Sequence, residues 1–282
     1  MNNKFIINLV PGSTFLHKLS GTTKVRLFAI LIVYIIMSFD FRLLLPVFIM
    51  GGIGLYSLKP NWKSLKFIVW FVILSNIFNI MIYYAVKPDI GFDWCNGSTI
   101  IYQFTPFYIV TKETLWYLGV RLFKLFTSFL VSLVFILSIT PSEFAAGLYS
   151  LHVPYKICSI VEIAFRYIPD IARDYTAISI SMQCRGVELD PKKAKLGDRI
   201  KQMVLILIPL VITSFDRIGN IANAMDLRGF GKGKKRTYYA EHEETPNDRI
   251  MEFVYIGFLL FVVGYIVYNF MYPAPTDMWC PF

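Results

Sequence analysis

The chain has 282 residues, of which 56% are hydrophobic and 17% are aromatic, and its mean hydropathy is +0.54. This composition excludes a soluble globular domain and indicates several membrane spans. The formal net charge is +9, but residues 139–249 hold 16 of the 28 basic and 13 of the 19 acidic residues, and this mixture of signs argues against a nucleic-acid-binding surface.

Five apolar segments are long enough to be predicted as spans, although the first two are short and so are expected to be distorted or off the membrane normal. They cover residues 25–39, 43–58, 65–84, 115–137 and 253–272. Residues 203–215 are also apolar, but this stretch has only 13 residues and contains Pro209. We expect it to form a helix packed beneath the membrane. A sixth span is the alternative, and it would place Arg185 and Arg228 on opposite sides.

The charges of the loops predict the orientation of the spans. Basic residues gather in the N-terminal segment, in loop 59–66 and in residues 139–249, whereas the other side carries few of them. The positive-inside rule then predicts a multi-pass membrane protein with the N-terminus and residues 139–249 in the cytoplasm. Residues 85–114 are expected to be a long outer loop.

The four cysteines contain no Cys-x-x-Cys pair, so no zinc or redox motif is predicted. Cys95 and Cys280 share the outer side in this topology, which leaves a disulfide or two isolated thiols as alternatives. We find no signal-peptide pattern at the N-terminus.

The cytoplasmic segment is predicted to be helical. Thr140-Pro-Ser-Glu143 has the pattern of a capping box with proline at the first helical position, and the helix that it opens continues to about Leu151. Further helices are expected over 155–168, from Pro169-Asp170 onward, and over 199–228. The predicted fold is all-α, with about five transmembrane helices and a cytoplasmic domain of about three helices. Its predicted divisions are 1–138, 139–236 and 237–282.

Two ten-residue stretches of this segment nearly repeat each other. Ile178-Ser-Ile-Ser-Met-Gln-Cys-Arg-Gly-Val187 aligns without gaps on Ile221-Ala-Asn-Ala-Met-Asp-Leu-Arg-Gly-Phe230. Each has the pattern of a helix end, with Ile and Met on one face, Arg three residues after Met, and a glycine to end the helix in the left-handed conformation. Ordinary capping explains one copy, but two copies favour a pair of guanidinium groups that enter two similar sockets.

Other charged motifs carry weaker functional predictions. Residues 229–235 are rich in Gly and Lys but lack phosphate-loop spacing, so we expect no ATP site in this chain. The three histidines are scattered and predict no metal site. Arg121 and Lys124 lie inside a predicted span, where charge is costly. They are expected either to extend toward the interface or to line a pathway.

These motifs together resemble the transmembrane T component of energy-coupling factor (ECF) transporters, which import vitamins and metal ions into prokaryotes. The likeness covers roughly residues 8–235. Besides the paired arginines, it includes the Pro11-Gly12-Ser13 opening with His17, Leu19 and Lys24, the Thr140–Glu143 helix start and Arg166-Tyr-Ile-Pro169. The chain departs from the family where Cys184 and Leu227 replace an alanine that often precedes each arginine.

The resemblance implies a coupling subunit without catalytic activity or cofactor of its own, in an importer of vitamins or other micronutrients. Its implied partners are two ABC-type ATPase subunits that bind the ATP, one substrate-binding membrane S component and the lipid bilayer, but no nucleic acid. The residues implied to dock the ATPases are Cys184, Arg185, Gly186, Leu227, Arg228 and Gly229. Those implied to form the coupling-helix surface are Ile178, Met182, Ile221 and Met225.

Two other classes of function remain as alternatives. A membrane-embedded lipid enzyme would need clustered acids or histidines near the membrane plane, and the sequence offers none. A self-contained channel or carrier would need Arg121 and Lys124 in its pathway. The sequence names neither the cargo nor the number of S components that one such subunit serves.

Overall fold

The computed structural model describes residues 14–58, 60, 62–95, 99–103, 109–187, 196–233, 246–271 and 280–281. These residues are mostly helical and belong to two compact units. The first contains residues 1–151 and 240–282, and the second contains residues 152–239. The predicted fold class, an all-α polytopic membrane protein, is confirmed.

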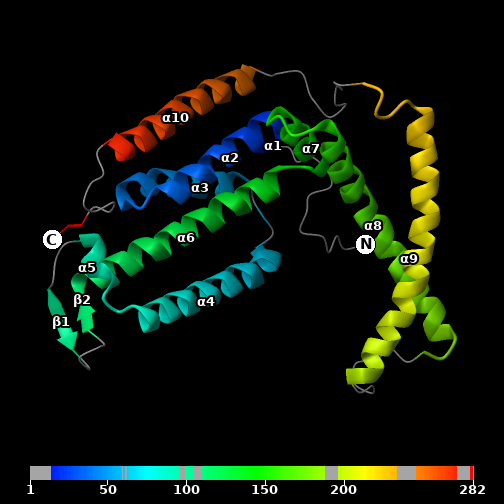
Figure 1. The fold of residues 1–282 in the computed structure, drawn as a ribbon, viewed down its shortest axis with the longest axis horizontal. Helices are drawn as coiled ribbons and strands as arrows, with labels where there is room; N and C mark the ends of the chain where they lie inside the picture. The colour runs from blue at the N-terminus through cyan, green and yellow to red at the C-terminus, as the bar shows by residue number, and fades with distance from the viewer. Residues whose placement is uncertain are drawn as a thin grey trace. The chain divides into compact units, whose positions relative to one another are not determined.

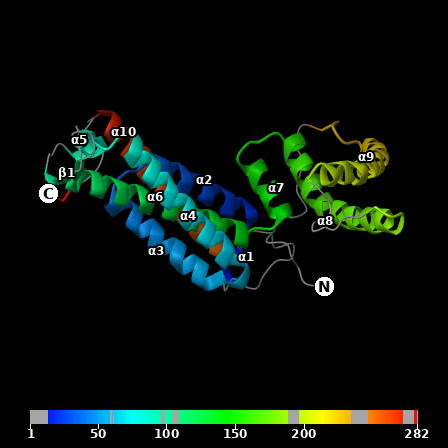
Figure 2. The same ribbon diagram turned by 90° about the horizontal axis from the view of Figure 1, so that it is seen from below.

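Long helices that run side by side form the first unit, as Figures 1 and 2 show. They are α2 (Gly21–Met37), α3 (Phe41–Leu58), α4 (Trp62–Val86), α6 (Lys112–Ser138) and α10 (Pro246–Met271). The central helix is α6, which contacts α2, α3 and α4, while α10 packs on α2. The bundle therefore places helices from both ends of the chain around one core.

Within the described residues, five helical segments are long and apolar enough to cross a membrane. They are Phe41–Leu58, Leu65–Val86, Lys112–Ser138, Met203–Leu227 and Asn247–Tyr268. Four of them match predicted spans, and the other contains residues 203–215. The predicted span 25–39 corresponds to α2, whose 17 residues rise about 26 Å at 1.5 Å per residue. This is less than the roughly 30 Å thickness of a bilayer core. Among the helices that correspond to predicted spans, α2 is the shortest.

The hydrophobic core of the first unit lies between α2, α3, α6 and α10. Its buried members are Tyr34, Ile35, Leu44, Val47, Val131 and Val262. The hydroxyl group of Tyr34 donates to the carbonyl oxygen of Leu43 at 3.0 Å, which satisfies the polar end of this buried ring. The ring of Phe28 stacks on that of Phe135 with centroids 4.0 Å apart, joining α2 to α6.

Short elements cover the two ends of the bundle (Figure 1). One end carries α5 (Ile90–Cys95) and the antiparallel strands β1 (Ile100–Gln103) and β2 (Ile109–Thr111). The other carries α1 (Phe15–Lys18) and α7 (Pro141–Ser150). The region predicted as an outer loop thus contains a helix and a hairpin, which the sequence pattern did not predict.

A disulfide joins Cys95 of α5 to Cys280 near the end of the chain, with their Cα atoms 5.8 Å apart. This decides between the two alternatives left open by the sequence. The bond connects positions 185 residues apart and so holds Cys280 against α5. Cys158 is a buried free thiol and Cys184 an exposed one.

The second unit is formed by α8 (Tyr155–Cys184) and α9 (Leu196–Leu227), which pack on each other. The predicted helix break at Pro169 is wrong, because α8 continues through this proline. A proline inside a helix costs about 3 kcal/mol, and we attribute the continuity to the packing of the amphipathic α8 on α9, which outweighs local propensity. The described part of residues 139–236 therefore contains three helices: α7, α8 and α9.

The boundaries between the two compact units lie after Leu151 and after Tyr239, whereas the sequence analysis predicted boundaries after residues 138 and 236. The helix α7 accounts for the first difference, since it packs on α2 and so belongs with the bundle. It is the last helix of the first unit before the chain enters α8.

The thiol chemistry of the chain follows from this arrangement. We predict that an alkylating reagent modifies only Cys184 in the native protein, because Cys158 is buried and Cys95 is bonded to Cys280. After unfolding, it should modify two thiols without reductant and four with reductant. Mass spectrometry of the intact chain counts the adducts. Four adducts on unfolded, unreduced protein would contradict the disulfide.

Candidate functional site

The first candidate site is the C-terminal end of α8. The N–H of Gly186 donates to the carbonyl oxygen of Gln183 at 3.0 Å, and the N–H of Val187 donates to that of Met182 at 3.1 Å. Gly186 has a φ of +86°, a conformation that glycine adopts without steric cost. These features make a Schellman cap, and they confirm the predicted left-handed glycine.

The end of α9 repeats this geometry. The N–H of Gly229 donates to the carbonyl oxygen of Asp226 at 2.9 Å, and the N–H of Phe230 donates to that of Met225 at 3.0 Å. The φ of Gly229 is +68°. The two sequence repeats are therefore also structural repeats, with the same cap at the same register.

Both repeats expose the same kind of side chain. Arg185 and Arg228 are exposed, as are the residues before them, Cys184 and Leu227, which is 89% exposed. The Ile and Met residues that share one face of each repeat, by contrast, are half-buried: Ile178, Met182, Ile221 and Met225. Each helix end thus combines a solvent-accessible guanidinium group with an apolar face that is partly covered.

The two helices of the second unit run antiparallel and pass one another (Figure 1). Tyr155, at the start of α8, lies edge-on to Phe230, just beyond the end of α9, with ring centroids 5.8 Å apart. Farther along, Arg217 of α9 forms an ion pair with Asp174 of α8. These contacts fix the direction and the register of the pair.

As a result, the structure does not bring the two arginines together. Arg228 lies at the end of the pair where α8 begins, and Arg185 lies where α8 ends. The 30 residues of α8 rise about 45 Å, so the two guanidinium groups are separated by a distance on the order of 40 Å. They cannot share one acceptor, and each would need a socket of its own.

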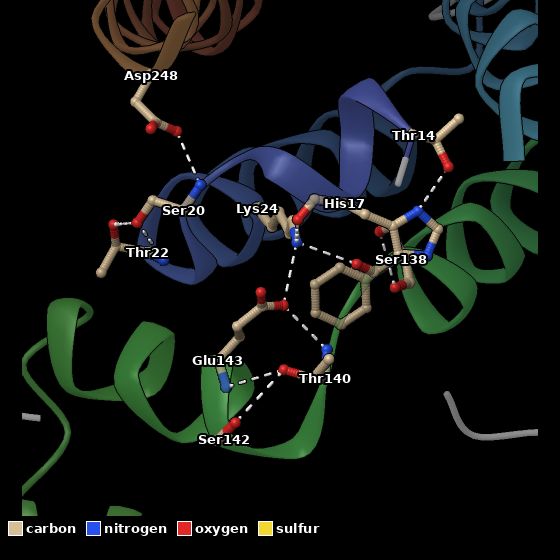
Figure 3. A network of polar contacts seen from close by, with 11 residues as sticks. Thr14, His17, Ser20, Thr22, Lys24, Ser138, Thr140, Ser142, Glu143 and Asp248 are labelled. Carbon is tan, nitrogen blue, oxygen red and sulfur yellow. Dashed lines mark hydrogen bonds and ion pairs between the residues drawn. The ribbon is translucent and has the colours of Figure 1, made fainter. Parts of the chain in front are cut away.

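A second polar site lies in the first unit, at the end of the bundle that carries α1 and α7 (Figure 3). The ammonium group of Lys24 donates to Glu143 Oε2 at 3.0 Å, to the carbonyl oxygen of Ser138 at 3.0 Å and to that of His17 at 3.1 Å. The side chains of Lys24 and Glu143 are 4% and 6% exposed. All three donors of the ammonium group are used, as burial of such a charge requires.

This Lys24 cluster (Lys24, Glu143, His17 and Ser138) is also the start of α7. Thr140 Oγ1 accepts from the N–H of Glu143 at 3.4 Å, and Glu143 Oε2 accepts from the N–H of Thr140 at 3.0 Å. The predicted capping box is therefore confirmed. One carboxylate oxygen serves both the cap and the ion pair, so the start of α7 is fixed to α2 by charge.

Other contacts extend the cluster to neighbouring elements. The N–H of Ser20 donates to Asp248 Oδ1 of α10 at 2.8 Å. His17 Nδ1 lies 2.8 Å from Thr14 Oγ1. Burial and the nearby Lys24 lower the pKa of His17 below its ordinary value, so the neutral ring is favoured where α1 meets α2.

Two glycines allow α2 and α7 to approach closely. A Cβ atom at Gly21 would lie 2.5 Å from the carbonyl oxygen of Glu143, and one at Gly147 would collide with the side chain of Val25. Any larger residue at either position would separate the helices and lengthen the Lys24–Glu143 pair. Lys24 and Glu143 each belong to a separate sequence motif, but no spacing rule could pair residues that are 119 positions apart.

The described residues contain no group of three His, Cys, Asp or Glu side chains that could hold a metal ion. The chemistry available at the helix ends is recognition, because an exposed guanidinium group donates several hydrogen bonds to carboxylate or carbonyl acceptors. The fold and these ends define a polytopic membrane protein with an antiparallel, arginine-tipped helix pair.

Comparison with known proteins agrees with this class. The profile of the CbiQ family, described as cobalt transport protein, matches residues 12–239. The energy-coupling factor transporter transmembrane protein EcfT of Bacillus subtilis is 26% identical over 275 residues, which cover 93% of this chain and 98% of that protein. EcfT of Staphylococcus aureus is 26% identical over 283 residues, covering 94% and 99%, and EcfT of Lactococcus lactis is 24% identical over 263 residues, covering 89% and 93%.

The chain therefore belongs to the CbiQ family, and its resemblance to the transmembrane T component of ECF transporters is confirmed. The matched segment includes both arginine-tipped helix ends as well as Lys24 and Glu143.

The Lys24 cluster yields a stability prediction. Lys24→Met and Glu143→Gln should each destabilise the protein by about 3–5 kcal/mol, because each leaves a buried charge without its partner. Glu143→Gln keeps an oxygen for the capping box, so it isolates the charge. Thermal unfolding in detergent measures the effect. The double variant should lose much less than the sum of the single losses, and fully additive losses would show that the two charges are not coupled.

Proposed function

We propose that this chain is the coupling subunit of an ECF-type importer of vitamins or other micronutrients. In this proposal two cytoplasmic ATPase subunits each receive one arginine-tipped helix end, and α8 and α9 pass the motion of the ATPases to a substrate-binding membrane S component. The observation that carries the proposal is the repetition of one cap and one exposed arginine at two distant ends of a single helix pair.

The physical properties of the helix ends support docking. A Schellman cap fixes the backbone that carries each arginine, so little entropy is lost when the guanidinium group is bound. A cation at the C-terminal end of a helix also lies in the favourable field of the helix dipole. The separation of the two ends suits a dimer of ATPases, in which equivalent sockets lie on different subunits.

We infer the orientation of the chain from two independent features. Disulfides form and persist in oxidising compartments, so the Cys95–Cys280 bond supports an outward-facing end that carries α5. The opposite end carries α1, α7 and the basic residues near the start of α2, which the positive-inside rule favours in the cytoplasm. The helix α7 leads into α8 from this inner end, and so the coupling helices are proposed to be cytoplasmic.

We propose further that the chain has no catalytic centre and binds no cofactor, with ATP held by the partner subunits. The Gly- and Lys-rich residues 229–233 follow the helix α9, whereas a phosphate-binding loop follows a strand. The alternative of a self-contained channel requires Arg121 and Lys124 to line a pathway. Arg121 instead lies over the ring of Tyr83, 3.6 Å from its centroid, and Lys124 donates to the carbonyl oxygen of Ile36 at 2.8 Å.

We predict that Arg185→Ala combined with Arg228→Ala abolishes copurification of the ATPase subunits with the tagged chain and abolishes uptake. Each arginine should contribute about 1.5–3 kcal/mol of charge-assisted hydrogen bonding, so each single variant should weaken assembly about tenfold to a hundredfold. Affinity purification from membranes, followed by mass spectrometry of the captured proteins, measures assembly.

Arg173→Ala is the matched control, since Arg173 is an exposed arginine of α8 that forms a surface ion pair with Asp170 at 3.4 Å. This variant should assemble normally. Unchanged assembly and uptake in the double variant, with normal insertion into the membrane, would contradict the proposal. Substrate uptake by the purified chain without any partner would favour the channel alternative instead.

A further inference from the structure

Two cations of α6 lie inside the membrane bundle, near the end that carries α5. The guanidinium group of Arg121 lies over the ring of Tyr83 and donates to the hydroxyl oxygen of Tyr117 at 3.4 Å. The ammonium group of Lys124 lies 3.5 Å from the ring centroid of Phe39 and donates to Ile36 at the end of α2. Both side chains are half-buried.

The aromatic rings that hold these cations form one continuous group. Trp94 lies 5.0 Å from Phe39 and 5.5 Å from Tyr117, and Tyr117 lies 6.3 Å from Tyr83, measured between ring centroids. Trp94 directly precedes Cys95, and its carbonyl oxygen lies 3.9 Å from the Sγ atom of Cys280. The disulfide therefore anchors the aromatic group on which Arg121 and Lys124 rest.

These contacts orient the two cations without neutralising them. Rings, a hydroxyl group and a backbone carbonyl carry no net negative charge, and no ion pair within the described ranges includes Arg121 or Lys124. Among the described residues, Arg121 uses one of its five N–H donors and Lys124 uses one of its three, so the others can bind a further acceptor. Two adjacent uncompensated charges in a membrane are costly, which favours an anion beside them.

The length of α6 places both cations within reach of lipid headgroups. Its 27 residues rise about 40 Å, and the hydrocarbon core spans roughly 20 residues of a helix. The helix α6 ends at Ser138, in the Lys24 cluster, and we place the inner boundary of the hydrocarbon core there. Counting roughly 20 residues back along α6 places the outer boundary near Gly119. Arg121 and Lys124 then lie within about 8 Å of the outer boundary, a depth from which long cationic side chains extend to the interface.

We propose that Arg121 and Lys124 bind the phosphate group of an anionic phospholipid from the outer leaflet. The guanidinium fork and the ammonium group would share the phosphate oxygens, and the rings of Tyr83 and Phe39 keep both cations in place. The assignment to the outer leaflet uses the orientation proposed above, whereas the binding itself is independent of it and of any ATPase.

Native mass spectrometry of the purified chain in detergent, titrated with phosphatidylglycerol or with phosphatidylcholine, tests this proposal. The chain should retain phosphatidylglycerol in preference to phosphatidylcholine. In the variant Arg121→Gln with Lys124→Gln this affinity should fall at least about tenfold, because two charge-assisted contacts are lost. The charge-preserving variant Arg121→Lys with Lys124→Arg should keep most of the affinity and shows that the site folds.

Lys156→Gln with Lys232→Gln is the control for net charge, since both lysines are exposed and lie in the second unit. It should bind phosphatidylglycerol as the unchanged chain does. Equal loss in this control, or unchanged binding in the Arg121/Lys124 glutamine variant, would overturn the proposal. Displacement of the lipid by millimolar inorganic phosphate would assign the site to free phosphate and would also overturn it.

Discussion

The antiparallel packing of α8 on α9 is the constraint on which the functional arrangement depends. Two helices that ran parallel would place both capped ends together, whereas this pair places them about one helix length apart. The ion pair between Arg217 and Asp174 and the contact of Tyr155 with Phe230 fix this geometry. Because the caps are equal and the ends are distant, the pair offers the same recognition element in two places. A short apolar face behind each arginine remains partly covered by the pair itself.

A different kind of constraint holds the first unit together. The Lys24–Glu143 pair and the close approach of α2 and α7 fix the end of the bundle that carries α1 and α7, and the Cys95–Cys280 bond fixes the end that carries α5. Between them, the core contacts of α2, α3, α6 and α10 are apolar, and apolar packing is non-directional. The positions of the helices along the bundle axis are therefore set at the two ends of the bundle, where the contacts are specific. The first of these fixed points lies at α7, the helix that precedes α8 in the chain.

Local signals in the sequence predicted much of this structure. Apolar runs predicted the bundle helices, the capping box at Thr140 predicted the start of α7, and the repeated Arg-Gly pattern predicted both caps. The break expected at Pro169 failed because packing outweighed propensity. The pairing of Lys24 with Glu143 could not be predicted, since it depends on the tertiary approach of α2 and α7. The hairpin β1–β2 was missed for a related reason, because strands of four and three residues carry too few positions to show an alternating pattern.

The central proposal is that each arginine-tipped end contacts its own ATPase subunit. Site-specific photo-crosslinking tests it most directly, with a photoreactive amino acid placed at position 184 or 227, both of which are exposed. In the assembled complex each position should crosslink to one ATPase polypeptide, and a chain labelled at both positions should crosslink to two. Crosslinks from only one of the two positions, or crosslinks to no ATPase at all, would contradict it.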